Sequence, residues 1–510
     1  MRFQRTIVLV LVSLSGLIFP RVISADEFLS SMDGKLRLSH ESLAISRQEQ
    51  MGLVGMSTLL ELGDHGYSGL SAFGAISGQR GGFFTGGFSS GLTIPVYHQL
   101  SIDTGLFIGG GGGGAAPQGG GLMFRAHAGV EYTMNNWHWG LQWSRIQFPN
   151  GAIDSTQLAA TLSRSVTFNL SSGWASDHTD RQQPLVESNS HPHRRLALTQ
   201  SHYFPTHNVR DTTGTLTGEP IRLLGFTIDF IQPMQAGLHP IYSLQTAGAL
   251  SGESDGYAEV LWAFGYRYRW DETFSGQTTL ALGAGGGGRV ASGGGLLSRL
   301  ASSFTYSANK VFQYSLVLGY VEAPQGDFRA EMAGFEIAYA YGIPGDPGSY
   351  SYTLVRHQHW RVSAVQQTYI SVQRKSNMNQ AEDRVELVGN KIDWMLSEHF
   401  YISGSAMAAY SGSAGGYATG QFGVGWQRSV TSQLAGNVEL LAGAGGGGGI
   451  AVSGGALLQA QAGLEWLLDK KRHFSLMASY GHVQATKGGL NSPLLNFSLA
   501  WRLSSKMLPY

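Results

Sequence analysis

The stretch GLFIGGGGGGAAPQGGGLMFRAHAGVEY, residues 105–132, decides the fold, because the chain contains it three times in related form. The second copy is TLALGAGGGGRVASGGGLLSRLASSFTY (279–306), and the third is ELLAGAGGGGGIAVSGGALLQAQAGLEW (439–466). The glycine runs extend from Gly109 to Gly114, from Gly283 to Gly288 and from Gly443 to Gly449. A period of about 160 to 174 residues is too long for a solenoid and indicates a repeated block of several elements.

The repetition extends beyond the glycine runs and divides the chain into units. YSGLSAFGAISGQRGGFF (67–84), IYSLQTAGALSGESDGYA (241–258) and YISGSAMAAYSGSAGGYA (401–418) agree in the spacing of small and aromatic residues. We therefore expect a first unit at 27–172, a second at 190–341 and a third at 355–505. The segments between the units are polar and rich in Gly, Pro, Ser and Asp, which is typical of linkers or long turns.

Within each unit, apolar and polar residues alternate with a period of two. In the first copy, Leu122, Phe124 and Ala126 fall on one face, whereas Arg125 and His127 fall on the other. Strict alternation of this kind predicts β-strands with one apolar face. Short turn sequences separate neighbouring strands, so consecutive strands are expected to pair as antiparallel hairpins.

The strand candidates number about eight per unit and about 24 in all, with the spacing typical of membrane barrels. This count predicts an all-β fold, a transmembrane antiparallel β-barrel of about 24 strands in which the three units are joined edge to edge. The alternative is three separate eight-stranded barrels, which the even strand number of each unit also allows. The glycine content favours the single barrel, because the interior of an eight-stranded barrel must be filled by side chains and glycine has none.

The amino-terminal segment indicates export. Arg2 and Arg5 precede an apolar run from Ile7 to Phe19, and Ala25 closes the segment, which is the pattern of a cleaved signal peptide over 1–25. The chain contains no cysteine, which excludes a disulfide framework, thiolate metal ligands and a cysteine nucleophile. Its 34 basic and 34 acidic side chains offer no general attraction to nucleic acid.

The strand pattern resembles that of bacterial outer-membrane β-barrels as a broad class. Tyr132, Trp137 and Trp466 lie toward strand ends, where such barrels carry aromatic girdles. The last strand alternates from Leu495 to Leu503, like the terminal strand by which these barrels are recognised for assembly, although SSKMLPY follows in place of a closing Phe. The resemblance implies a Gram-negative outer membrane, with the amino terminus in the periplasm. It also implies contacts with the lipid bilayer and lipopolysaccharide, and insertion by the barrel assembly machinery.

Polar side chains on the faces opposite the apolar ones are candidates to line a lumen. They are Arg125, His127, Glu131, His138 and Gln142 in the first unit, Arg299 in the second, and Gln459, Gln461 and Glu465 in the third. Together such side chains could form a polar constriction that selects solutes. The alternative is a hydrogen-bonded network that braces the wall.

Candidate catalytic and metal sites are weak. GFSSG (87–91) matches G-x-S-x-G around Ser89, but that motif requires a strand, a strained turn and a helix, and here it lies inside an alternating strand. The pairs His191/His193 and His357/His359 could each place two imidazoles on one face of a strand, yet no third ligand is implied. We therefore expect neither an enzyme, nor a cofactor, nor a bound metal.

For the glycine runs, a structural role is favoured, in which the wall bends or a neighbouring segment packs against bare backbone. A smooth surface for a passing polymer or a plug is the alternative. For the whole chain, the first hypothesis is a pore or export conduit for a solute or polymer. A structural or adhesive surface protein with glycine-rich interaction segments is the second, and an outer-membrane lipid hydrolase is the third.

Overall fold

The computed structural model describes residues 32–46, 48–168, 170–174, 194–206, 209–215, 219–232, 237–251, 254–341, 356–469 and 473–507. Within them the regular elements are antiparallel strands, β1 to β25, which confirms the all-β fold predicted from the alternation. No helix in the described part of the chain is long and apolar enough to cross a membrane. The expected signal peptide lies outside the described residues.

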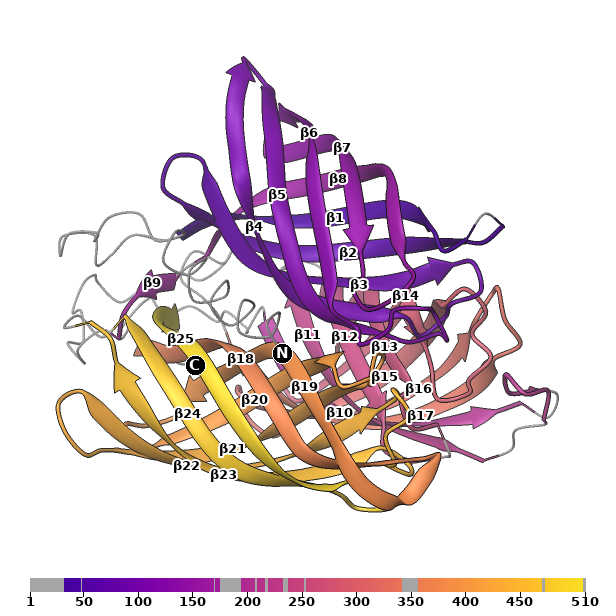
Figure 1. Cartoon of the computed structure of the whole chain (residues 1–510). Coiled ribbons are helices and arrows are strands. Elements are labelled where there is room, and N and C mark those ends of the chain that lie inside the picture. The colour runs from indigo at the N-terminus through magenta and orange to yellow at the C-terminus, as the bar shows by residue number, and fades with distance from the viewer. Residues whose placement is uncertain are drawn as a thin grey trace, which may run out of the picture.

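The strands form three groups that follow one another along the chain (Figure 1). The first barrel consists of β1 (Met32–Ala44), β2 (Gln50–Leu62), β3 (Gly66–Ser77), β4 (Phe84–Tyr97), β5 (Leu100–Gly112), β6 (Met123–Met134), β7 (Trp137–Gln147) and β8 (Asp154–Phe168). The second barrel consists of β10 (Arg194–Pro205), β11 (Ile221–Ile231), β12 (Leu238–Ala249), β13 (Ala258–Arg269), β14 (Phe274–Gly286), β15 (Leu296–Ser307), β16 (Phe312–Glu322) and β17 (Arg329–Tyr341).

The third barrel consists of β18 (Arg356–Arg374), β19 (Asn377–Met395), β20 (Phe400–Ser411), β21 (Ala418–Ser429), β22 (Leu434–Gly446), β23 (Ala456–Leu467), β24 (Phe474–Ala485) and β25 (Asn491–Met507). A short strand from between the first two barrels, β9 (Leu170–Ser172), pairs with the end of β25. Within each barrel, strands that follow one another in sequence pair with each other.

Each group closes on itself rather than joining the next one. Strand β1 pairs with β8, with Lys35 opposite Ser165, and in the same way β10 pairs with β17 and β18 with β25. Closure leaves no strand edge unpaired, which is the condition for a sheet in lipid. The chain therefore does not form the single wall of about 24 strands that we favoured, but the alternative of three eight-stranded barrels.

The argument from glycine failed for a physical reason. It assumed that the glycines would line the lumens and leave them empty. The runs lie instead at one end of each barrel, and long polar and aromatic side chains fill the interiors. An eight-stranded barrel can hold side chains of this size.

Alternation along the strands sorts side chains between the outside and the inside of each barrel. On β7, Trp139 and Trp143 face outward with 53% and 61% of their surface exposed, whereas Gln142 and Ser144, on either side of Trp143, are buried. Exposed aromatic and aliphatic side chains of this kind occur on the outer walls of all three barrels. Apolar side chains outside and polar ones inside are the arrangement of a barrel in lipid.

The two ends of each barrel differ. At one end, which we call the turn end, the connections are short, such as 98–99 and 135–136, and the chain enters and leaves each barrel there. At the other end, the loop end, most connections are longer, such as 78–83 and 113–122, although 375–376 in the third barrel has only two residues. The glycine runs lie at the loop ends.

Buried apolar residues close the lumens near the loop ends. In the first barrel, Phe83 packs edge-on against Phe148, with 5.9 Å between ring centroids, and Phe73 against Phe107 at 5.1 Å. The corresponding clusters include Tyr203, Tyr257 and Phe328 in the second barrel and Tyr369, Tyr417 and Ile450 in the third. We call these three groups the apolar seals.

Candidate functional site

The interior of the first barrel holds a connected network of ion pairs below its apolar seal. Glu131 on β6 accepts from Lys35 Nζ at 2.7 Å and from an Arg37 guanidinium nitrogen at 3.2 Å. Arg37 also pairs with Asp103 on β5 at 2.9 Å. Strand pairing explains this convergence, because inward positions of β1, β5 and β6 face one lumen.

The five candidate residues of the first unit all lie in this interior. Arg125 pairs with Glu41 at 2.6 Å, and its guanidinium is 3.1 Å from His127 Nδ1. Gln142 donates to Asp103 at 2.6 Å. His138 lies 3.3 Å from Glu131 and also bonds to the hydroxyls of Thr133 and Ser165. The network therefore fills the cross-section with mutually bonded side chains.

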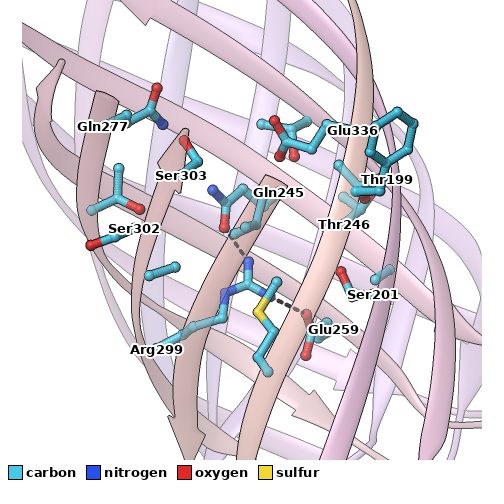
Figure 2. Close-up of a pocket in the computed structure, with 17 residues that line it drawn as sticks. Thr199, Ser201, Gln245, Thr246, Glu259, Gln277, Arg299, Ser302, Ser303 and Glu336 are labelled. Carbon is cyan, nitrogen blue, oxygen red and sulfur yellow. Dashed lines mark hydrogen bonds and ion pairs between the residues drawn. The ribbon is translucent and has the colours of Figure 1, made fainter. Parts of the chain in front are cut away.

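The second barrel has two ionic groups with a small cavity beside them. Toward the turn end, Arg195 pairs with Asp229 at 2.7 Å and with Glu336 at 2.5 Å. Toward the loop end, Arg299 pairs with Glu259 at 2.8 Å and also donates to Gln245, as Figure 2 shows. The cavity has a volume of about 40 Å³, which is room for a few water molecules, and hydroxyl and amide side chains line much of it.

The third barrel centres on Glu465, which pairs with Arg361 at 2.7 Å and Arg502 at 2.8 Å. Lys391 pairs with Glu439 at 2.7 Å. The candidates Gln459 and Gln461 are bonded to each other at 3.1 Å and are buried beside this network. All nine candidate lumen residues thus lie inside a barrel, within three separate networks.

The ionised side chains inside each barrel balance in charge. Asp33, Glu61 and Arg269 occupy inward positions at the turn-end mouths, and deeper inside each barrel three cationic side chains lie with three anionic ones. They are Lys35, Arg37 and Arg125 with Glu41, Asp103 and Glu131, then Arg195, Arg267 and Arg299 with Asp229, Glu259 and Glu336, and then Arg361, Lys391 and Arg502 with Asp393, Glu439 and Glu465. Such pairing is required because an unpaired buried charge costs several kcal/mol.

Fourteen of these eighteen ionised side chains were missed from the sequence, although a signal was present. Arg37 stands between Leu36 and Leu38, and Arg361 between Trp360 and Val362. A single charge flanked on both sides by apolar residues in an alternating strand points away from the apolar face. Applied to every strand, this rule would have selected Arg37, Arg361 and Asp393.

The glycine runs mark the contacts between barrels. The run of the second barrel and the loop that follows it meet the β3–β4 loop of the first, where Gly81 N donates to Gly293 O at 2.8 Å. A Cβ on Gly81 would lie 2.6 Å from the same oxygen, closer than real Cβ atoms approach. The backbones can meet this closely because side chains are absent.

The other two contacts repeat this arrangement. The run of the third barrel meets the β12–β13 loop of the second, where a Cβ on Gly446 would lie 2.7 Å from Gly256 Cα. The run of the first barrel meets the β20–β21 loop of the third, where a Cβ on Gly416 would lie 2.9 Å from Gly113 N. Each barrel thus inserts its run into a neighbour, and the three contacts form a closed ring. We call them the glycine junctions.

The remaining candidates do not form a site in the described residues. Ser89 lies within β4, where its hydroxyl bonds to that of Ser71 at 2.7 Å, and not at a strand–turn–helix elbow. His359 stacks on Trp174 with ring centroids 5.6 Å apart. His191 and His193 lie outside the described residues. Among those described, no group of three or more His, Cys, Asp or Glu is placed to hold a metal ion.

No family model and no curated protein matches the chain. Among solved structures, it is similar to a variant of the ferric enterobactin receptor PfeA from Pseudomonas aeruginosa in complex with enterobactin, with 10% identity, 93% of this chain and 81% of that chain covered, and a TM-score of 0.30. It is also similar to the siderophore receptor PirA from Acinetobacter baumannii, with 8% identity, 94% of this chain and 81% of that chain covered, and a TM-score of 0.30. For the outer membrane protein opdK from Pseudomonas aeruginosa, the identity is 10%, the comparison covers 93% of this chain and 98% of that chain, and the TM-score is 0.21. Because these scores are low, we argue function from this chain's own residues.

Proposed function

We propose that the protein is an integral outer-membrane protein exported through the signal peptide at 1–25. Outward side chains such as Leu316 and Leu318 are 63% and 67% exposed and would be covered by lipid. Short turns on one side and longer loops on the other are typical of outer-membrane barrels, with the short turns in the periplasm. In that orientation the glycine junctions face the cell exterior. The lipid bilayer and lipopolysaccharide would contact the outer wall, and insertion would require the barrel assembly machinery.

Within the membrane, we propose that each barrel is a gated passage for small ions or polar solutes. The observation that carries this proposal is the balanced set of ionised side chains in every lumen. Buried ion pairs add little net stability compared with apolar residues of the same volume. Ionisable groups at membrane depth are costly and commonly mark the path of an ion or solute.

The apolar seals would act as gates. A dry apolar constriction stops ions by excluding water, and it opens when a small rearrangement lets water in. Because the lumens are narrow and filled, small solutes suit them better than a polymer. The export of a polymer would require all the side chains that fill a lumen to move out of it.

The filled lumens also support the second hypothesis, a structural surface protein. In that case the ion pairs brace the walls, and the loop ends present the glycine junctions as a rigid surface. The two hypotheses differ in a measurable property, because bracing networks do not conduct.

Recording from the purified protein in planar lipid bilayers separates these two functions. The gated-passage proposal predicts brief, small current steps that occur in up to three equal levels. Glu131→Gln leaves the first barrel with an excess of positive charge, since Lys35 and Arg37 lose their shared carboxylate. It should lengthen the openings of one level and shift that level toward anions.

The matched control is Asp154→Asn, which removes a carboxylate of the same barrel from an exposed pair with Arg145. It should leave the currents unchanged. If neither the parent protein nor Glu131→Gln conducts, the passage proposal is wrong and the structural role stands.

A further inference from the structure

A segment that leaves the first barrel is bound at the turn end of the third. Strand β9 continues the wall of the third barrel beyond the start of β24, with Ser172 opposite Leu503 and Leu170 opposite Ser505. In Figure 1, β9 has the colour of the first barrel but lies beside the end of β25. Leu503 and Ser172 are more than 300 residues apart in sequence, so the contact is specific to the folded chain.

Backbone and hydroxyl hydrogen bonds fix this segment. Gly173 N donates to Arg502 O at 2.8 Å, and Ser504 Oγ donates to Gly173 O at 2.7 Å. On the outer side, Trp501 Nε1 donates to Ser172 Oγ at 3.0 Å. Gly173 has a φ of +90°, which turns the chain from the wall toward the lumen and disfavours any residue with a side chain.

The next residue, Trp174, covers the mouth of the lumen. Its ring lies over the guanidinium of Arg502, with Cζ 4.0 Å from the ring centroid, and stacks on His359 at an angle of 11°. Arg502 and His359 both occupy inward positions, on β25 and β18. The indole Nε1 donates to Trp360 O at 3.0 Å, which fixes the orientation of the ring.

Trp174 is also joined to the ion-pair network of the third barrel. Arg502 beneath it pairs with Glu465, and Glu465 pairs with Arg361. Withdrawing the ring would expose Arg502 to water and remove a desolvated cation–π contact. The same movement would therefore open the mouth and loosen the charges behind it.

We propose that Leu170–Trp174 is a stopper for the turn-end mouth of the third barrel, with Trp174 as its gating residue. This proposal rests on the proposed function for its purpose, but not for its geometry. The stopper lies in the chain between the first and second barrels but closes the third.

A thiol-accessibility experiment tests the stopper without requiring conduction. The chain contains no cysteine, so Ser475→Cys introduces a single thiol at a fully buried inward position near this mouth. In the full-length protein in lipid vesicles, adding Trp174→Ala should raise the rate of modification by a small charged thiol reagent roughly tenfold, the order expected for one desolvated cation–π contact. Trp139→Ala removes an outward tryptophan of the first barrel and should leave the rate unchanged.

A second variant is needed because the backbone hydrogen bonds between β9 and β25 could hold the segment in place after the Trp174 ring is removed. Gly173→Pro removes the donor to Arg502 O and cannot adopt a positive φ, so it should release the whole segment. Equal modification rates in the parent, Trp174→Ala and Gly173→Pro would overturn the stopper. Faster modification in both variants supports the stopper, whether or not the protein conducts. Absence of conduction together with faster modification would refute only the proposed passage.

Discussion

Adding one methyl group at a glycine junction should separate two barrels. Gly446 has no positive φ, so alanine at this position is not strained by its own backbone. Its Cβ would nevertheless lie 2.7 Å from Gly256 Cα and 2.8 Å from the carbonyl carbon of Asp255, both in the second barrel. Overpacking against backbone costs about 1–3 kcal/mol, which lowers the ratio of docked to separated barrels by roughly 5- to 150-fold.

The ion pair between Lys375 and Asp255 reports on this junction directly. Their charged atoms are 2.5 Å apart, and they belong to the third and second barrels. A zero-length carbodiimide reagent should join them in the parent protein, and mass spectrometry of the digested protein can quantify the product. Gly446→Ala should reduce the yield of this cross-link several-fold, because its clash is with the residues on either side of the Asp255–Gly256 peptide bond.

Gly420→Ala is the matched control, since it adds the same methyl group to the same barrel at a position with no atom within 4 Å of the new Cβ. It should retain the parent yield. Equal yields for Gly446→Ala and Gly420→Ala would refute the view that close backbone contact at the glycine runs holds the barrels together.

Two further predictions concern the loops and the outer wall. Arg80 bonds to Glu49 and to Ala115 O beside the first glycine run, and its hydrogen bond and charge hold the pKa of Glu49 below its usual range. Because the pKa of Glu49 is lower in the folded protein than in the unfolded chain, its ionised form stabilises the fold. This stabilisation is present above the unfolded pKa and is lost as the pH falls through the folded pKa, so protease resistance of this loop should decline below about pH 4. Arg80→Ala should cause the same decline at neutral pH. On the outer wall, Leu318→Arg near the centre of β16 should cost about 2–4 kcal/mol and reduce folding into vesicles, whereas Val430→Arg at a turn should cost about 0–1 kcal/mol, and equal folding yields would count against a lipid-facing wall.

The sequence predicted the strands well because alternation is a local property. The alternating segments that contain Phe124 and Phe497 became β6 and β25, and their apolar faces point outward. Closure could not be predicted in the same way. Whether β8 pairs with β1 or with the next unit depends on contacts between residues more than 100 positions apart, such as Lys35 and Ser165.

The candidate residues show the same division. Glu131 and Glu465 were found because each lies on the polar face of a clearly alternating strand, but their partners Lys35 and Arg361 depend on which strands share a lumen. The glycine runs were recognised, yet their contacts could not be assigned, because a residue without a side chain carries no pattern that selects a partner. Trp174 had no signal, since it follows the last strand of its unit and binds in another barrel.

The central claim is that this chain lies in a membrane as three small closed barrels joined at their glycine junctions. Electron-microscopy class averages of the protein in lipid nanodiscs, viewed along the membrane normal, test it most directly. The account predicts three small rings in mutual contact, each with density inside. One wide ring, or a protein that does not enter the nanodisc, would contradict it.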